Sequence, residues 1–166
     1  MTELIISKGR DEALESFETV YERHVNMLYR VCFSYMKNEA ETEDVMADVF
    51  VKLLRYGRRF QSVEHEKVWL LRTAINLCKD RLKHWWRRCE DINKYQNIET
   101  ENSFVENETL KAVMELSDRY KAVIYLYYYE GYSSAEIAEI LKKPQSTILN
   151  HLSEARKLLR GVLKNE

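Results

Sequence analysis

The sequence predicts an all-α protein made of two small helical domains joined by a flexible linker. Apolar residues recur at steps of three and four over most of the chain, which is the spacing of one helix face. One proline and four glycines among 166 residues are too few for the tight turns of a sheet protein. Residues 89–107 lack this period and are polar and acidic, so we expect domains at 1–88 and 108–166 with a linker between them.

Three helices are expected in the N-terminal domain. Periodic apolar residues predict helices over residues 17–36 and from about 67 to 86. Between them, Asn38 and Glu41 form a capping pair that begins a further helix, and Gly57 ends it. This middle helix runs to about Leu54 and is expected to bury four apolar side chains: Val45, Val49, Leu53 and Leu54.

The C-terminal domain has the pattern of a helix-turn-helix. Helices are predicted over about 108–116 and over 117–131, and Ser133 with Glu136 then matches a capping box that begins a short helix. A tight turn at 142–144 precedes a longer helix over 145–163, which is expected to bury Ile148, Leu152 and Ala155. In such a motif the second helix can enter the major groove of DNA. A small helical bundle without a DNA role is the alternative that the pattern alone leaves open.

Charge is unevenly distributed although the formal net charge is only −1. Residues 52–88 carry eleven Lys and Arg against three Asp and Glu, and residues 119–166 carry eight against five. Residues 1–51 carry five against eleven, and residues 89–118 carry two against eight. Alternating blocks of this kind can serve a protein partner and a polyanion on one chain. Solvated helix faces would give the same pattern.

The sequence indicates no catalytic, cofactor or metal site. We find no arrangement of nucleophile and base, no phosphate-binding glycine loop and no paired C-x-x-C motif. Cys32, Cys78 and Cys89 are irregularly spaced and are expected to be reduced thiols. No run of eighteen apolar residues or signal peptide is visible, so we expect a cytoplasmic protein without membrane insertion.

Four segments, taken in order, resemble regions of sigma factors. TEDVMADVFVKLL resembles region 2.2, and EKVWLLRTAINLCKDRLKHWWRR resembles regions 2.3 and 2.4. LSDRYKAVIYLYYYEGYS resembles the helix that leads into region 4, and YSSAEIAEILKKPQSTILNHLSEARKLL resembles region 4 itself. The combination is typical of the extracytoplasmic-function (ECF) subfamily of sigma-70 factors. The resemblance implies a factor that binds core RNA polymerase and directs promoter recognition and melting in transcription initiation, without being an enzyme.

Three groups of site residues follow from the resemblance. Docking on polymerase is expected to involve Asp44, Asp48, Phe50 and Leu53. The minus-ten promoter element is expected to contact Arg59, Arg72, Asn76, Lys79 and Lys83. The minus-thirty-five element is expected to contact Thr147, Asn150, His151 and Arg156. Helical geometry supports the second group, because its last four residues fall within about 60° on one helix. Such a stripe offers cations to phosphates and an amide to a base edge.

Several positions depart from the sigma-factor pattern. Lys142 and Lys143 stand where the family has glycine and an aliphatic residue, and Leu149 and Glu154 stand where basic residues are common. The preferred promoter sequence therefore stays open, as do the presence of an anti-sigma factor and the contacts of the Trp85–Trp86 pair. Two other functions also fit: a helix-turn-helix transcriptional regulator, or a polymerase-binding module that does not recognise promoters.

Overall fold

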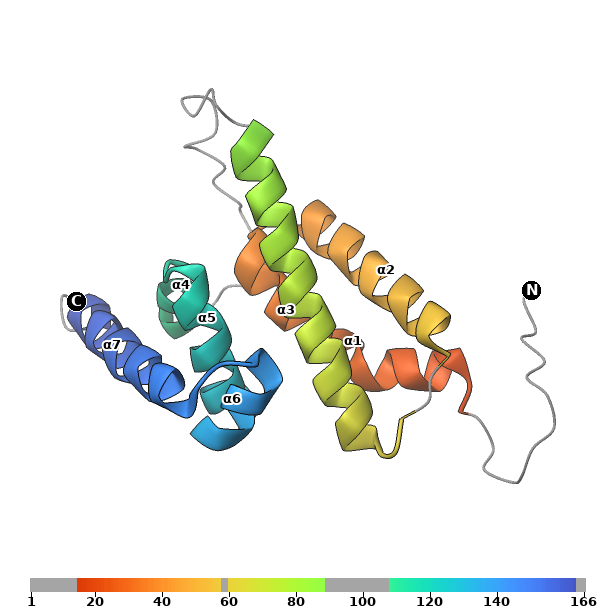
Figure 1. The fold of residues 1–166 in the computed structure, drawn as a ribbon. Helices are drawn as coiled ribbons and strands as arrows, with labels where there is room; N and C mark the ends of the chain where they lie inside the picture. Colours follow the sequence, from red (N-terminus) through yellow and green to blue (C-terminus); the bar gives the residue numbers. More distant parts are fainter. Residues whose placement is uncertain (1–14, 58–59, 89–107, 164–166) are drawn as a thin grey trace.

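A computed structural model describes residues 15–57, 60–88 and 108–163, and throughout these ranges the ordered elements are helical (Figure 1). The N-terminal unit consists of α1 (Phe17–Met36), α2 (Glu39–Tyr56) and α3 (Val63–Arg88). The C-terminal unit consists of α4 (Glu108–Met114), α5 (Asp118–Ile124), the π-helical turn η2 (Tyr125–Tyr129), α6 (Ser134–Leu141) and α7 (Gln145–Leu163). The all-α prediction is confirmed. The expected linker, residues 89–107, lies outside the described residues.

Local capping bonds explain most helix boundaries. The Asn38 side chain accepts a hydrogen bond from the backbone N–H of Glu41 at 2.8 Å, which begins α2. Ser133 and Glu136 form the expected capping box, with bonds of 2.8 and 3.2 Å that begin α6. Gly57 follows α2 with a φ of 80°, a conformation that glycine adopts without steric cost.

Two helices differ from the sequence prediction. Helix α3 begins at Val63, earlier than residue 67, because Ser62 Oγ accepts a hydrogen bond from the backbone N–H of His65. The helix expected to run to residue 131 changes at Tyr125 into a π-helical turn, where the backbone N–H of Glu130 donates to the Tyr125 carbonyl. Periodicity does not reveal this turn, because residues 125–129 are all aromatic or apolar and no polar position marks the shift of phase that the extra residue introduces.

The N-terminal unit is a three-helix assembly around one apolar core. Leu28 and Val31 of α1, Val49 and Leu53 of α2, and Leu71 of α3 are fully buried in it. The prediction that Leu54 points inward is wrong, because its side chain is 40% exposed. Leu53 fills the core position instead, and the next residue on a helix lies about 100° away from it.

The helix-turn-helix packs through α6 and α7. Ile137 and Ile140 of α6 are buried against Ile148, Leu152 and Ala155 of α7, and the last three were expected to be inward. In the turn, Lys142 has a φ of 53° and the backbone N–H of Lys143 donates to the Ala138 carbonyl. The chain thus forms the left-handed helix end with lysine where glycine is usual.

The two units pack against each other, with α1 and α3 of the first facing α4, α5 and α6 of the second (Figure 1). Tyr132 donates a hydrogen bond to Glu64 at 2.6 Å, and Lys67 forms an ion pair with Glu130 at 2.7 Å. The apolar core is continuous across this contact. The two domains therefore form one body in this arrangement.

Lys121 of α5 is buried where the units meet. It is 3% exposed, and its ammonium lies 5.5 Å from the centre of the Tyr35 ring of α1. Its nearest acid, Asp118, is 3.9 Å away, which is a weak pairing for a buried charge. Burial, reinforced by the charge of Lys37, lowers the pKa of Lys121 to about 8. The other charged or titratable groups that affect it are Asp118, Glu115 and Cys78.

We predict that Lys121→Met stabilises the protein at pH 7 by up to about 3 kcal/mol, because a lowered pKa measures the cost of burying the charge. That cost is complete below pH 8 and is relieved between pH 8 and the ordinary lysine value of 10.5, where only the unfolded chain keeps the proton. Denaturant unfolding from pH 7 to 10.5 should therefore show the parent approaching the variant as pH rises. A constant gap would contradict this account.

Candidate protein and nucleic-acid interfaces

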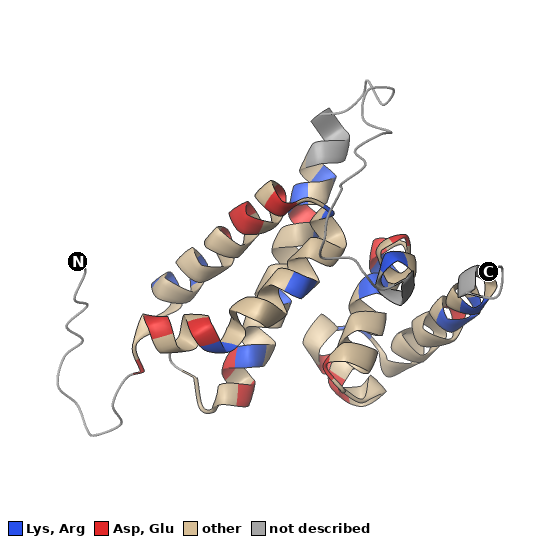
Figure 2. Ribbon diagram, turned by 180° about the vertical axis from the view of Figure 1, so that it is seen from behind, with Lys and Arg blue, Asp and Glu red and all other residues tan. Residues whose placement is uncertain are grey.

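Helix α2, at the outer edge of the N-terminal unit, carries several acidic residues (Figure 2). Asp44 and Asp48 are both exposed, as a docking role requires. Arg81 of α3 reaches across to this face, with its guanidinium 3.1 Å from Asp48, 3.7 Å from Asp44 and 2.8 Å from Glu41. The hydrogen bond to Glu41 raises the pKa of Arg81. The acidic face is therefore partly neutralised and its side chains are held in position.

Two expected docking residues lie below the surface. Leu53 is fully buried, so its side chain supports the helix and cannot touch a partner. Phe50 is 7% exposed and packs its ring 4.9 Å from that of Tyr21. It forms one wall of a groove of about 350 Å³ between α1 and α2. The groove is lined by Tyr21, Val25, Tyr29, Glu43, Met46, Ala47 and Phe50.

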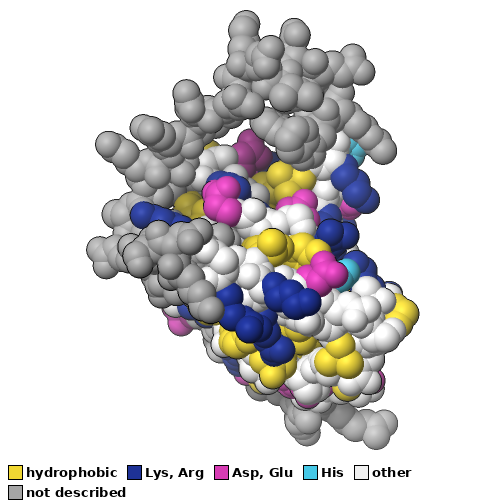
Figure 3. Space-filling model, turned by 90° about the vertical axis from the view of Figure 1, so that its left-hand side faces the viewer, with side chains coloured by type: hydrophobic (Ala, Val, Ile, Leu, Met, Phe, Trp, Pro, Cys, Tyr) yellow, Lys and Arg dark blue, Asp and Glu magenta, His cyan; other side chains and the backbone are white. Residues whose placement is uncertain are grey.

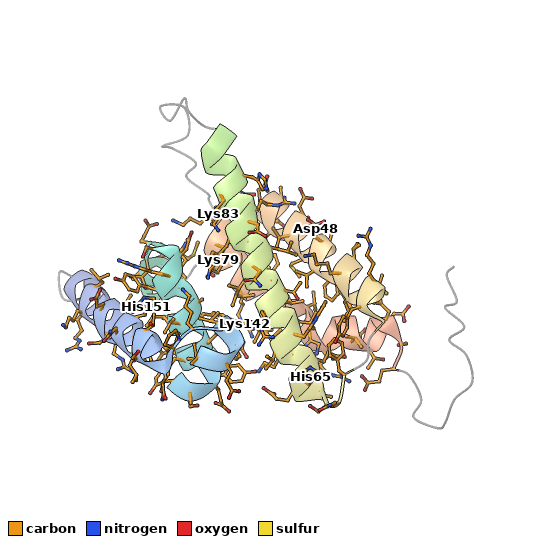
Figure 4. All side chains as sticks on the ribbon, viewed as in Figure 1. Asp48, His65, Lys79, Lys83, Lys142 and His151 are labelled. Carbon is orange, nitrogen blue, oxygen red and sulfur yellow. The ribbon has the colours of Figure 1, made fainter. Side chains whose placement is uncertain are left out.

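The cationic stripe lies on the other side of α3. Figure 4 shows Lys79 and Lys83 on the side turned toward α5 and α7, away from Asp48 on α2. Asn76 and Lys83 are exposed, and Lys79 is partly buried. Burial lowers the pKa of Lys79, and the nearby charge of Lys143 in the helix-turn-helix lowers it further. Arg59 lies outside the described residues, as do the side chains of Trp85 and Trp86.

Arg72, the fourth described member of the stripe, is bound to the other unit. Its Nε donates to the carbonyl of Ile140 at 2.8 Å, and its Nη2 donates to the carbonyl of Glu139 at 3.1 Å. These carbonyls belong to the last turn of α6, where helix carbonyls lack partners and the helix dipole favours a cation. In this arrangement the guanidinium is occupied by protein backbone.

The first half of α7 carries three of the residues expected at the minus-thirty-five element. Asn150 is exposed, whereas Thr147 and His151 are partly buried. The His151 ring meets Tyr120 edge-on at 5.6 Å, and its Nδ1 is buried without a hydrogen bond in the described part of the chain. Burial lowers the pKa of His151, followed by the charge of Lys143, so the neutral ring is favoured.

Arg156 lies further along α7 and packs on aromatic rings. Its Nε donates to the Tyr128 hydroxyl at 2.7 Å, and the guanidinium lies 5.2 Å from the centre of the Tyr127 ring. Figure 3 shows the side of the molecule that α7 forms, where basic and apolar side chains lie next to one another. Leu149 and Leu158 are both about half exposed. Sequence reasoning missed the tyrosine platform, since η2 brings it to α7 only in the folded chain.

Each of the two units matches the model of a known protein family. The family model for Sigma-70 region 2 matches residues 20–88, and that for Sigma-70, region 4 matches residues 106–159. RNA polymerase sigma factor SigV of Bacillus subtilis is 31% identical over 147 residues, which are 86% of this chain and 88% of SigV. ECF RNA polymerase sigma factor SigW of the same species is 25% identical over 96% of this chain and 94% of its own length. The chain belongs to the ECF sigma factors.

The fold of this sigma factor agrees with solved structures. The sigma factor RpoE from Bartonella quintana, solved with the anti-sigma factor NepR, matches with a TM-score of 0.73 and 21% identity over 91% of this chain and 98% of RpoE. CnrH, solved with the cytosolic domain of CnrY, matches with a TM-score of 0.62 and 19% identity, covering 90% of this chain and 88% of CnrH. At these identities the likeness concerns the fold.

The described residues contain no group of three or more His, Cys, Asp or Glu side chains that could hold a metal ion. Among the described helices, none combines the length and the apolar character that a membrane span requires.

We predict that replacing both exposed acids of α2, in the double variant Asp44→Asn with Asp48→Asn, weakens binding to core RNA polymerase by tenfold or more. Exposed ion pairs contribute roughly 0–1 kcal/mol each, so the thermal unfolding midpoint should change little. The matched control is Glu22→Gln with Glu139→Gln, which removes the same charge from exposed positions elsewhere. Equal losses of affinity in the two variants would show that the acidic face of α2 is not part of the docking surface.

Proposed function

We propose that this ECF sigma factor docks on core RNA polymerase through the acidic face of α2 and contacts promoter DNA through α3 and α7. The observation that carries the assignment is the separation of the two faces of α3. Arg81, which faces α2, and Arg72, which faces the C-terminal unit, are nine residues apart and so lie on opposite sides of the helix. The side of α3 that faces α2 can therefore remain next to the polymerase while the opposite side of α3 contacts DNA.

The minus-ten contact is assigned to Asn76, Lys79 and Lys83. An exposed asparagine amide can hydrogen-bond a base edge, and lysines on the same stripe can pair with phosphates. Reading a melted strand requires bases to leave the stack, and a cationic groove can hold the backbone of the released single strand. Arg72 joins this surface once its bonds to α6 are released. Arg59 is proposed from the sequence alone.

The minus-thirty-five contact is assigned to the first half of α7. Thr147, Asn150 and His151 are supported as base contacts by their place at the beginning of the second helix of the motif. The exposed side chain of Leu149 adds apolar surface that suits a thymine methyl group. Arg156, held on the tyrosine platform, is better placed for a phosphate. Glu154 accepts a hydrogen bond from Tyr120 at 2.6 Å, which directs this acid toward the protein.

We further infer that the chain catalyses no reaction itself, because RNA synthesis belongs to the polymerase that it directs. The bacterial cytoplasm is then its place of action, since its two main partners, core polymerase and promoter DNA, are there. Regulation by an anti-sigma protein is part of the proposal. It is supported by the structure of RpoE, a sigma factor of the same fold that was solved in complex with the anti-sigma factor NepR.

Promoter-dependent run-off transcription with purified core polymerase tests the proposal directly. A sigma factor should give transcripts of defined length from a matching promoter, and core polymerase alone should not. A helix-turn-helix regulator would bind DNA without core polymerase. A module that only binds polymerase would form the complex but give no defined transcript, and either result would contradict the assignment.

We predict that alanine at Lys79 and Lys83 lowers transcription from all duplex promoters alike, whereas Asn76→Ala changes the preferred minus-ten base. Loss of an amide contact to a base edge should cost about 1–3 kcal/mol if it is bidentate. Transcription from templates carrying a pre-melted bubble should partly restore the lysine variants. Normal transcription by these variants from intact duplex would show that the stripe does not contact promoter DNA.

A further inference from the structure

Basic side chains from four separate elements gather where α3 meets the C-terminal unit. Lys79 lies on α3, Arg119 on α5, Lys143 in the turn between α6 and α7, and His151 on α7. Burial, followed by the charge of Lys143, lowers the pKa of both Lys79 and His151. Figure 4 shows Lys79 on the side of α3 that is turned toward the C-terminal unit, and His151 where α7 meets α5. These four residues, which we call the cationic cluster, are therefore neighbours in space although they are far apart in the sequence.

The acids beside the cationic cluster are engaged with other side chains. Asp118 forms an ion pair with Lys121 at 3.9 Å, and Glu154 accepts a hydrogen bond from the Tyr120 hydroxyl at 2.6 Å. Both acids act on the cluster through space, Asp118 on its α3 lysine and Glu154 on its histidine. Within the described part of the chain, however, neither lysine of the cluster nor its arginine forms an ion pair. The cluster therefore has an excess of positive charge that the protein does not pair.

Partial burial makes this unpaired charge costly. Lys79 and Lys143 are both partly buried, so water and salt screen their repulsion less than they would at an exposed site. Nδ1 of His151 is buried and lacks a hydrogen-bond partner among the described residues, which also costs free energy. Arg119 is exposed, and its guanidinium lies 4.7 Å from the centre of the Tyr120 ring. An anion bound among these groups would replace repulsion between the cations by attraction.

The side chains of the cluster suit a small polyphosphate anion. Lysine and arginine both form charge-assisted hydrogen bonds to phosphate oxygens. Lys83, which is exposed, follows Lys79 by one helical turn, about 6 Å along the axis of α3, so the cations extend beyond the reach of a single phosphate group. A chain of phosphates carries several negative charges over a short length and can meet several of these cations at once. A single phosphate or a carboxylate would leave some of them unpaired.

We propose that the cationic cluster is a binding site for a small polyphosphate anion, which Lys79 of α3 holds together with Arg119 and Lys143 of the C-terminal unit. The site goes beyond the polymerase and promoter contacts proposed above, and it shares only Lys79 and His151 with them. Promoter DNA and the anion would compete for Lys79. The free sigma factor would therefore respond to the concentration of a phosphorylated small molecule.

The test is a calorimetric titration of the full chain with sodium triphosphate, without divalent cations, DNA or polymerase. The parent should bind one triphosphate per chain, and orthophosphate should bind at least about tenfold more weakly because it meets fewer cations. Arg119→Gln with Lys143→Gln should weaken triphosphate binding at least about tenfold, since each change removes a charged hydrogen-bond donor. Lys79→Gln should weaken it as well, because the site needs a cation from each unit.

The matched control is Lys52→Gln with Arg55→Gln, which removes the same two residue types from exposed positions of α2. Helix α2 lies on the other side of α3 from the helix-turn-helix (Figure 1), so the control should bind triphosphate like the parent. Thermal unfolding without ligand shows whether each variant is folded. Added triphosphate should raise the unfolding midpoint of the parent and of the control, because a ligand of the folded state stabilises it by mass action.

Three results would overturn the proposal: no saturable binding of triphosphate by the parent, unchanged binding by the Arg119/Lys143 variant or by Lys79→Gln, or an equal loss of binding in the α2 control. A cluster that serves only promoter DNA would give the first of these results. Failure of the sigma assignment would look different. The parent would then give no promoter-dependent transcript, while the titration, which contains neither DNA nor polymerase, would still report on the anion site.

Discussion

Helix α3, which is 26 residues long, contacts three other helices, α1, α2 and α6. Its apolar side, with Leu71, Ala74 and Ile75, forms the core with α1 and α2. Arg81 reaches the acids of α2, and Arg72 reaches the carbonyls at the end of α6. The 100° step of an α-helix separates these roles, because each neighbour meets a different side of the same rod. The arrangement of both units depends on this helix.

The basic residues of α3 do not form a single free cationic surface. Several basic residues within 52–88 are bound to other parts of the protein. Arg81 pairs with acids of α2, Lys67 pairs with Glu130, and Arg72 donates hydrogen bonds to backbone carbonyls. Cations engaged in this way add little to the long-range attraction of a polyanion. The factor therefore has a DNA-binding surface without a strongly basic surface overall, which limits indiscriminate attachment to duplex DNA.

Local features of the fold were predictable from the sequence, whereas contacts between helices were not. The first helix, the Ser133–Glu136 capping box and the buried face of α7 agree with prediction, since each depends on neighbours within a few residues. The burial of Leu54 was predicted wrongly, because helical periodicity does not fix the edge of an apolar face to within one residue. The partners of Arg81 and Arg72 lie 33 to 68 residues away along the chain, a relation that no helical period contains.

Arg72 binds α6 through main-chain carbonyls, and this choice of acceptor affects how the family can diverge. Every amino acid presents the same carbonyl, so substitutions at positions 139 and 140 leave the two acceptors unchanged. The helix-turn-helix can therefore acquire new base preferences during evolution while it keeps its attachment to α3. Arg72 itself has no such freedom, because lysine lacks the planar fork that spans two adjacent carbonyls. Lineages that change their target genes should vary α6 and α7 while retaining arginine at this position.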